Sequence, residues 1–77
     1  VADANQSQQY QQALQLQQQD KFADSLPLLA QLVKQSPGNG DYQASYGVAL
    51  QQTGKLTEAI SAYDKAIAAN PQNAMFY

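Results

Sequence analysis

Residues 54–67 read GKLTEAISAYDKAI, and the stretch 34 residues upstream, residues 20–33, reads DKFADSLPLLAQLV. The two stretches share a lysine in second place, an acidic residue in fifth place and aliphatic residues in seventh and fourteenth place. A period of about 34 residues is typical of a helix–turn–helix unit that stacks on its neighbours. Because one such unit cannot bury its own apolar face, the sequence predicts a stack of helix pairs.

The same offset continues on both sides of these stretches. It relates Pro37 to Pro71, Asn39 to Asn73, Leu16 to Leu50 and Gln9 to Gln43. The period therefore divides residues 1–77, taken as a single domain, into a first repeat of about 6–39 and a second of about 40–73. Residues 74–77 are interpreted as the start of a third repeat, because proline and asparagine close the second repeat as they close the first.

Four helices are predicted, at about residues 5–19, 23–35, 41–53 and 57–69, with the first turn of a fifth from residue 74. Asp20 and Gly54 occupy equivalent turns, where both residue types tolerate the left-handed backbone that ends a helix. Pro27 is expected inside the first turn of its helix or just after it, where the missing N–H is tolerated. Asn39 is placed to cap the third helix.

Apolar residues recur at helical spacing in the predicted helices. The tract Gln6–Gln19, which holds many of the chain's fifteen glutamines, is interpreted as a polar-faced helix, because Tyr10, Ala13, Leu14 and Leu16 interrupt it at helical intervals. In the second helix the apolar stripe is Leu26, Leu29, Leu32 and Val33, with Leu28 beside it. The apolar members of the third helix are Tyr42, Tyr46, Val48, Ala49 and Leu50. The residues expected to face inward in the fourth helix are Ala59, Ile60, Tyr63, Ala66 and Ile67.

With these residues the chain resembles the tetratricopeptide repeat family. Counted from Gly40, the second repeat fits that family at six preferred positions, namely Gly47, Leu50, Ala59, Tyr63, Ala66 and Pro71. At two further positions Tyr46 replaces the usual leucine and Gln43 stands where a large residue is preferred. The first repeat fits less closely, with Ala13, Leu16, Ser25, Leu29 and Leu32 at the matching positions and a polar Gln12. The resemblance implies an all-α fold, a right-handed α-solenoid of antiparallel helix pairs with two repeats and the start of a third.

Small residues at two of these positions have a packing role. Gly47 and Ala59 are expected to let two helix backbones approach closely, with Ala66 doing the same at the next junction. Tyr63 is expected to fill the wider gap between repeats.

Composition excludes several classes of function. The chain has no histidine and no cysteine, which removes the commonest general base and the thiolate metal ligands. Its net charge is -2, with four lysines and no arginine, so it carries no basic surface for nucleic acid. No apolar run is long enough to cross a membrane. We expect no catalytic, cofactor or metal site, and therefore not an enzyme.

The resemblance also implies a binding surface. First helices of successive repeats line a concave groove in this family, and the positions that face it carry over to Tyr10, Gln11, Leu14, Gln17, Gln18, Asp41, Ala44, Ser45, Val48, Gln51 and Gln52. A clamp for a peptide carboxylate is rejected, because no cation occupies the required positions. Tyr10, Leu14 and Val48 form an apolar strip among glutamine amides, which suits a peptide or partner helix. For Tyr10 and Leu14, ordinary packing within the repeats is an equal alternative.

The last complete helix suggests a second surface. Tyr63, Ile67, Met75, Phe76 and Tyr77 are expected to form an apolar face, so either the chain continues beyond Tyr77 or it stacks on a copy of itself. The sequence therefore predicts a protein–protein interaction module or assembly scaffold, with a self-associating building block as the alternative and a homo-oligomer as a further possibility. It does not fix a compartment, although a Gln-rich, Lys-poor composition leans toward a bacterial cell envelope or periplasm.

Overall fold

A computed structural model describes residues 2–69 of the chain, and the side chains of residues 6–69. The described part holds four helices, α1 (Ala2–Gln18), α2 (Phe22–Gln35), α3 (Gly40–Gln52) and α4 (Leu56–Ala69), and no strand. The prediction of four helices is confirmed, and most of their ends lie within a residue of the predicted ones. The predicted fifth helix from residue 74 lies outside the described residues.

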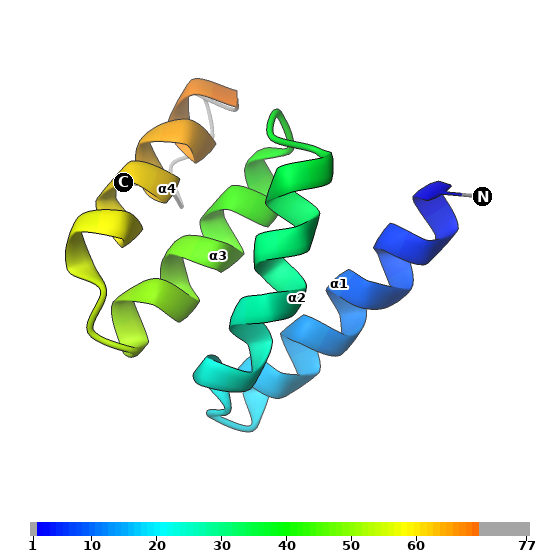
Figure 1. Ribbon diagram of the computed structural model, residues 1–77, viewed down its shortest axis with the longest axis horizontal. Coiled ribbons are helices and arrows are strands. Elements are labelled where there is room, and N and C mark those ends of the chain that lie inside the picture. Colours follow the sequence, from blue (N-terminus) through cyan, green and yellow to red (C-terminus); the bar gives the residue numbers. More distant parts are fainter. Residues whose placement is uncertain (1, 70–77) are drawn as a thin grey trace.

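The four helices stand side by side in chain order (Figure 1), each packed chiefly on the helix that precedes or follows it. Helix α1 also touches α3 lightly, which brings the first helices of the two repeats together. Helices α1 and α4 lie at opposite ends of the row, so each has one side without a neighbouring helix among residues 2–69. This is the all-α solenoid of helix pairs that the period predicted.

The turns inside the two repeats are built in the same way. Asp20 has a φ of 60° and Gly54 a φ of 84°, so both adopt the predicted left-handed conformation. The next residue in each turn, Lys21 or Lys55, donates its backbone N–H to the carbonyl of Leu16 or Leu50 at 2.8 Å. These long backbone bonds satisfy carbonyls that the helix end would otherwise leave free. Equivalent positions thus perform the same local task with different residues.

The turn between the repeats sets where α3 begins. Asn39 has an extended backbone, and its side-chain oxygen accepts a hydrogen bond from the N–H of Tyr42 at 3.2 Å. The predicted N-cap is therefore confirmed. The Asn39 N–H donates to the carbonyl of Ser36 at 3.0 Å, which closes the turn around Pro37.

Pro27 lies just after the first turn of its helix, the later of the two positions that the sequence suggested, where a backbone hydrogen bond is lost. The Ser25 N–H already bonds the carbonyl of Lys21, so the first turn of α2 is complete before Pro27, which is the sixth residue of the helix. A proline at that point removes the bond that would reach the carbonyl of Ala23. Because Ala23 is exposed, water can solvate that carbonyl, and the helix continues to Gln35.

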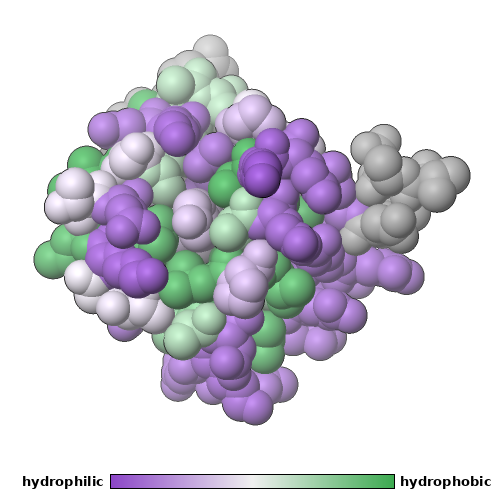
Figure 2. All heavy atoms as spheres, viewed as in Figure 1, coloured by the Kyte–Doolittle hydropathy of each residue, from purple (hydrophilic) through white to green (hydrophobic). Residues whose placement is uncertain are grey.

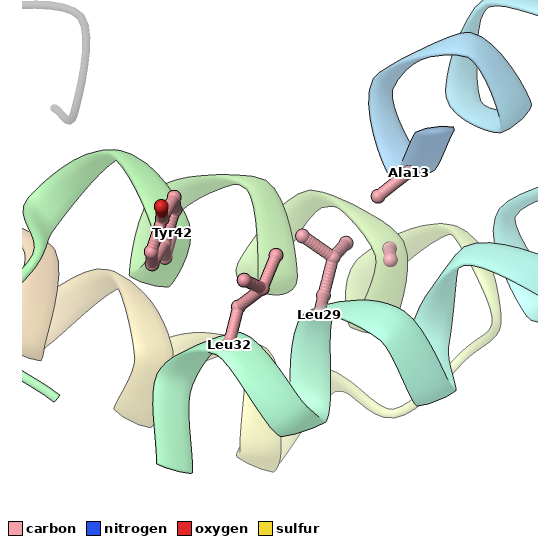
Figure 3. Close-up of a cluster of buried hydrophobic side chains, with 5 residues drawn as sticks. Ala13, Leu29, Leu32 and Tyr42 are labelled. Atoms are coloured by element: carbon pink, nitrogen blue, oxygen red, sulfur yellow. The ribbon is translucent and has the colours of Figure 1, made fainter. Parts of the chain in front are cut away.

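The core lies where the two repeats meet. Figure 3 shows Leu29 and Leu32 of α2 directed toward the region between the helices, where Ala13 of α1 and Tyr42 of α3 also lie. Ala13, Leu29 and Leu32 are completely buried, and Tyr42 is 8% exposed. A second cluster of Leu50, Ala59 and Ala62 lies between α3 and α4. The partly buried Leu26 and Tyr46 pack against both clusters and join them into one core.

Gly47 and Tyr63 meet inside the second repeat. A Cβ at Gly47 would lie 2.9 to 3.1 Å from three carbon atoms of the Tyr63 ring, which is too close for normal packing. The glycine therefore makes room for the Tyr63 ring. The close approach expected at Gly47 is thus one between the α3 backbone and a side chain of α4. Tyr63 packs on α3 of its own repeat, against the cluster of Leu50, Ala59 and Ala62. The gap toward a following repeat, which Tyr63 was expected to fill, lies outside the described residues.

Two residues lie where the sequence did not predict. Ile60 was expected to face inward but is 62% exposed, because no helix among residues 2–69 covers that side of α4. Gln43 is only 3% exposed, although its side chain is polar. Its amide donates a hydrogen bond to the carbonyl of Pro37 at 3.0 Å, which compensates for its loss of water. No described buried side-chain polar atom lacks a partner.

Candidate partner-binding groove

The residues predicted to line the groove all lie on α1 and α3, and several of them contact one another across these helices. The Tyr10 hydroxyl lies 2.8 Å from Oγ of Ser45 and 3.4 Å from the carbonyl oxygen of Asp41, to which it donates. The side-chain amide of Gln17 donates to the Ser45 carbonyl at 2.9 Å. Tyr10 and Gln17 are seven residues apart, about two turns, so they meet α3 from the same face of α1.

Tyr10 belongs partly to the packing between repeats. Its ring lies 4.8 Å from that of Tyr42 at a tilt of 55°, a favourable aromatic arrangement. Burial raises the pKa of the Tyr10 phenol, the nearby Asp41 and Tyr42 raise it further, and the hydrogen bond with Ser45 lowers it. Packing within the stack, the alternative considered for Tyr10, accounts for these contacts.

Leu14 and Val48 are half-buried, as are Ala44 and Ser45. The exposed members of the predicted set are Gln11, Gln18, Asp41, Gln51 and Gln52. Gln51 accepts a hydrogen bond from the Tyr63 hydroxyl at 3.0 Å, so one of its amide atoms is engaged inside the repeat. The set has one carboxylate and no lysine. Its chemistry is therefore that of amides beside aliphatic side chains, with little net charge.

The face predicted for self-association is only partly described. Tyr63 and Ile67 are half-buried on α4, and burial raises the pKa of the Tyr63 phenol. Met75, Phe76 and Tyr77 lie outside the described residues. The structure adds Leu56 and Ile60, which are 59% and 62% exposed and are the large hydrophobic side chains left exposed among those described. Periodicity places Ile60 on an apolar side of α4, but it does not tell whether another helix covers that side.

Other kinds of site have little support. Within the described residues no three acidic, histidine or cysteine side chains gather where they could hold a metal ion. Likewise, none of the helices there has the length and apolar character needed to cross a bilayer.

The four packed helices, two in each repeat, define a helical-repeat module. The family model described as Tetratricopeptide repeat matches residues 10–74, which is most of the chain, and the chain belongs to this family. Repeats of this family generally mediate protein–protein interactions or act as scaffolds. Searches found no significantly similar curated protein and no significantly similar solved structure.

Proposed function

We propose that the chain acts as a protein-interaction module that binds an uncharged peptide segment or partner helix on the α1–α3 face. The observation that carries the proposal is the set of half-buried aliphatic side chains, Leu14 and Val48, among the exposed amides of Gln11, Gln18 and Gln52. Aliphatic side chains provide apolar anchors, and amides both donate and accept hydrogen bonds to a peptide backbone. Because this face offers amides and aliphatic groups, it suits a ligand whose own side chains carry no charge.

Side-chain hydrogen bonds across this face favour the same function. The contacts of Tyr10 and Gln17 with Ser45 fix α1 against α3, so the two helices hold their spacing without a ligand. A surface arranged before binding loses less conformational freedom when the partner arrives. Tyr10 then serves the groove by positioning its walls, and the direct contacts fall to the aliphatic and amide side chains.

The test is a selection of displayed random peptides followed by affinity measurement on the purified chain. We expect enrichment of peptides poor in charged residues, and we expect Val48→Gln or Leu14→Gln to weaken their binding about tenfold or more, a loss of about 1.4 kcal/mol. Gln15→Glu, on an exposed site of α1 outside the predicted groove, is the matched control and should leave binding unchanged. Failure to enrich peptides, or equal effects of the three variants, would contradict the proposal.

A second candidate function is self-association through the ends of the repeat stack. The exposure of Leu56 and Ile60 favours it, because two large apolar side chains on one side of a helix lose unfavourable contact with water when a partner covers them. An assembling building block and a peptide-binding module use different helices of the chain, so the two functions are compatible and can be tested separately.

A further inference from the structure

We propose that the outer side of α4 pairs with the same side of α4 in a second copy of the chain. The residues concerned are Leu56, Ile60, Tyr63 and Ile67, called here the α4 stripe. This inference rests on the second candidate function and goes further, because it names the surface, the partner and the symmetry of the contact.

The spacing of the α4 stripe is that of a helix–helix seam. Its residues follow one another at intervals of four, three and four, which places them along one side of α4. A neighbouring side of the same helix carries the buried Ala59, Ala62 and Ala66. Helix α4 is therefore apolar on two adjacent sides. One side is packed in the molecule, and on the other Leu56 and Ile60 are exposed while Tyr63 and Ile67 are half-buried.

The first repeat shows what covers such a stripe. The positions 34 residues upstream of Ile60, Tyr63 and Ile67 are Leu26, Leu29 and Val33 of α2. These three residues belong to or pack against the central cluster, where α3 supplies Tyr42 and Ala49. Helix α3, the first helix of the next repeat, thus covers this side of α2. The equivalent side of α4 has the chemistry to be covered by a helix as well.

A second copy could offer either its α1 or its own α4, and α1 is unsuited. The α3 residues Tyr42, Tyr46 and Ala49 correspond to Gln8, Gln12 and Gln15 of α1 at the same offset. All three glutamines are exposed. Stacking α4 on the α1 of another copy would remove amides from water against aliphatic side chains, which offer them no hydrogen bonds.

The space-filling view agrees with this difference between the ends. Figure 2 shows hydrophilic residues gathered over α1, whereas hydrophobic and hydrophilic residues alternate on the surface over α4 at the opposite edge. The apolar counterpart that a copy offers to the α4 stripe is its own α4 stripe. Such a contact is isologous, with the same patch on both chains, and it closes as a dimer instead of extending as a filament.

The expected pairing is weak. One helix from each chain covers less area than the roughly 1,200 Å² of a standard stable interface, so we expect dissociation constants on the order of 100 μM. The net charge of -2 per chain adds little repulsion between copies.

The absence of cysteine from the chain permits a clean proximity test with single-cysteine variants of the full 77-residue chain. Ile60→Cys marks the α4 stripe, and Gln12→Cys, on the exposed side of α1, is the matched control. Under mild oxidation we expect Ile60→Cys to form disulfide-linked dimers at least tenfold faster than Gln12→Cys. In light scattering across a concentration series, we expect Ile60→Glu to abolish dimers and Gln12→Glu to leave them unchanged.

The same measurements separate failure of this interface from failure of self-association as a whole. A monomeric mass at every concentration would overturn both, including the case in which residues 70–77 of the same chain cover the stripe. A dimer that survives Ile60→Glu would leave self-association standing and overturn the α4 pairing. Preferential cross-linking between Ile60→Cys and Gln12→Cys chains would show head-to-tail stacking and overturn the isologous contact.

Discussion

At the scale of single residues, the two repeats fill one equivalent space with different pairs of side chains. In the first repeat Ala13 faces the interior beside Leu29, and both are completely buried. In the second repeat the same two positions hold Gly47 and Tyr63, whose ring lies against the glycine. The larger Tyr63 faces the smaller Gly47, and the smaller Leu29 faces the larger Ala13. Each pair therefore fills the equivalent space between its two helices.

The pairing predicts a reversal of sign in a double-mutant cycle. Gly47→Ala should gain about 1 kcal/mol of helix propensity but lose about 1–3 kcal/mol by overpacking against Tyr63, for a net destabilisation of about 1 kcal/mol. In a Tyr63→Leu background, the same change yields the alanine–leucine pair of the first repeat and should stabilise the chain by about 0.5–1 kcal/mol. Urea unfolding of the four proteins measures the cycle. Equal effects in both backgrounds would show that the ring and the glycine are not coupled.

A second residue-scale prediction concerns the left-handed turns. Asp20 adopts a φ of 60° that glycine adopts without steric cost, whereas Gly54 already occupies the matching site. We expect Asp20→Gly to raise the free energy of unfolding by about 0.5–1 kcal/mol and Gly54→Ala to lower it by about 1–2 kcal/mol. Thermal unfolding followed by circular dichroism compares them. The opposite ranking would mean that the Asp20 side chain stabilises its turn by more than the backbone strain costs.

The third residue-scale prediction is a pH dependence that follows from Tyr10. Its pKa is raised in the folded chain, chiefly by burial, so above about pH 10 the unfolded chain loses this proton first. The folded state then binds more protons than the unfolded state, and the free energy of unfolding falls as pH rises through the folded pKa. Tyr10→Phe should flatten this alkaline decline relative to its own value at pH 7. An unchanged slope in urea unfolding from pH 7 to 11 would exclude Tyr10 as its source.

At the scale of the helices, capping determines where α3 begins. The Asn39 side chain accepts the N–H of Tyr42, whose ring is part of the core, so the cap also fixes the start of a helix that packs on both neighbours. We expect Asn39→Ala to destabilise the chain by about 1 kcal/mol and Asn39→Asp to have little effect, since aspartate caps equally well. Equal losses for the two substitutions in chemical unfolding would assign the effect of Asn39 to something other than the cap.

The helices and turns were predictable because they depend on signals local to the chain. Apolar spacing fixed the helices, and Asp20, Gly54 and Asn39 each act on their own turn, so their roles could be inferred without knowledge of distant residues. Pro27 was less certain, because its place in the helix depends on a starting residue that propensity defines only within one or two positions. Because Pro27 lies in the second turn of α2 and not in the first, one backbone hydrogen bond, to the exposed carbonyl of Ala23, is lost.

The misplaced residues depend on neighbours that local patterns do not reveal. Periodicity assigns Ile60 to an apolar side of α4 but not whether a further helix covers it. Gln43 is buried because the turn at Pro37 offers a carbonyl to its amide. For the groove, the sequence selected residues on α1 and α3, and the pairing of Tyr10 and Gln17 with Ser45 emerged only from their distances. Whether a partner binds there remains a prediction.

At the scale of the whole molecule, the two ends of the stack that residues 2–69 form differ in chemistry. The outer side of α1 presents Gln8, Gln12 and Gln15, which favour contact with water. The outer side of α4 presents Leu56 and Ile60. In a repeat stack, each interior helix pair is stabilised by neighbours on both sides, and an end pair by one. A polar end can face water without a neighbouring helix pair, whereas an apolar end favours association with another surface.

This difference predicts unequal costs for one substitution at equivalent positions of the two repeats. Leu26 packs against both core clusters, whereas its counterpart Ile60 is 62% exposed. In dilute solution, we expect Leu26→Ala to lower the free energy of unfolding by about 2 kcal/mol and Ile60→Ala by less than about 0.5 kcal/mol. At millimolar concentration the cost of Ile60→Ala should rise if copies pair through the α4 stripe, because the dimer adds its binding energy to stability, while the cost of Leu26→Ala should stay constant. Thermal unfolding at two concentrations measures both, and a cost of Ile60→Ala that does not depend on concentration would leave α4 as an end without a partner copy.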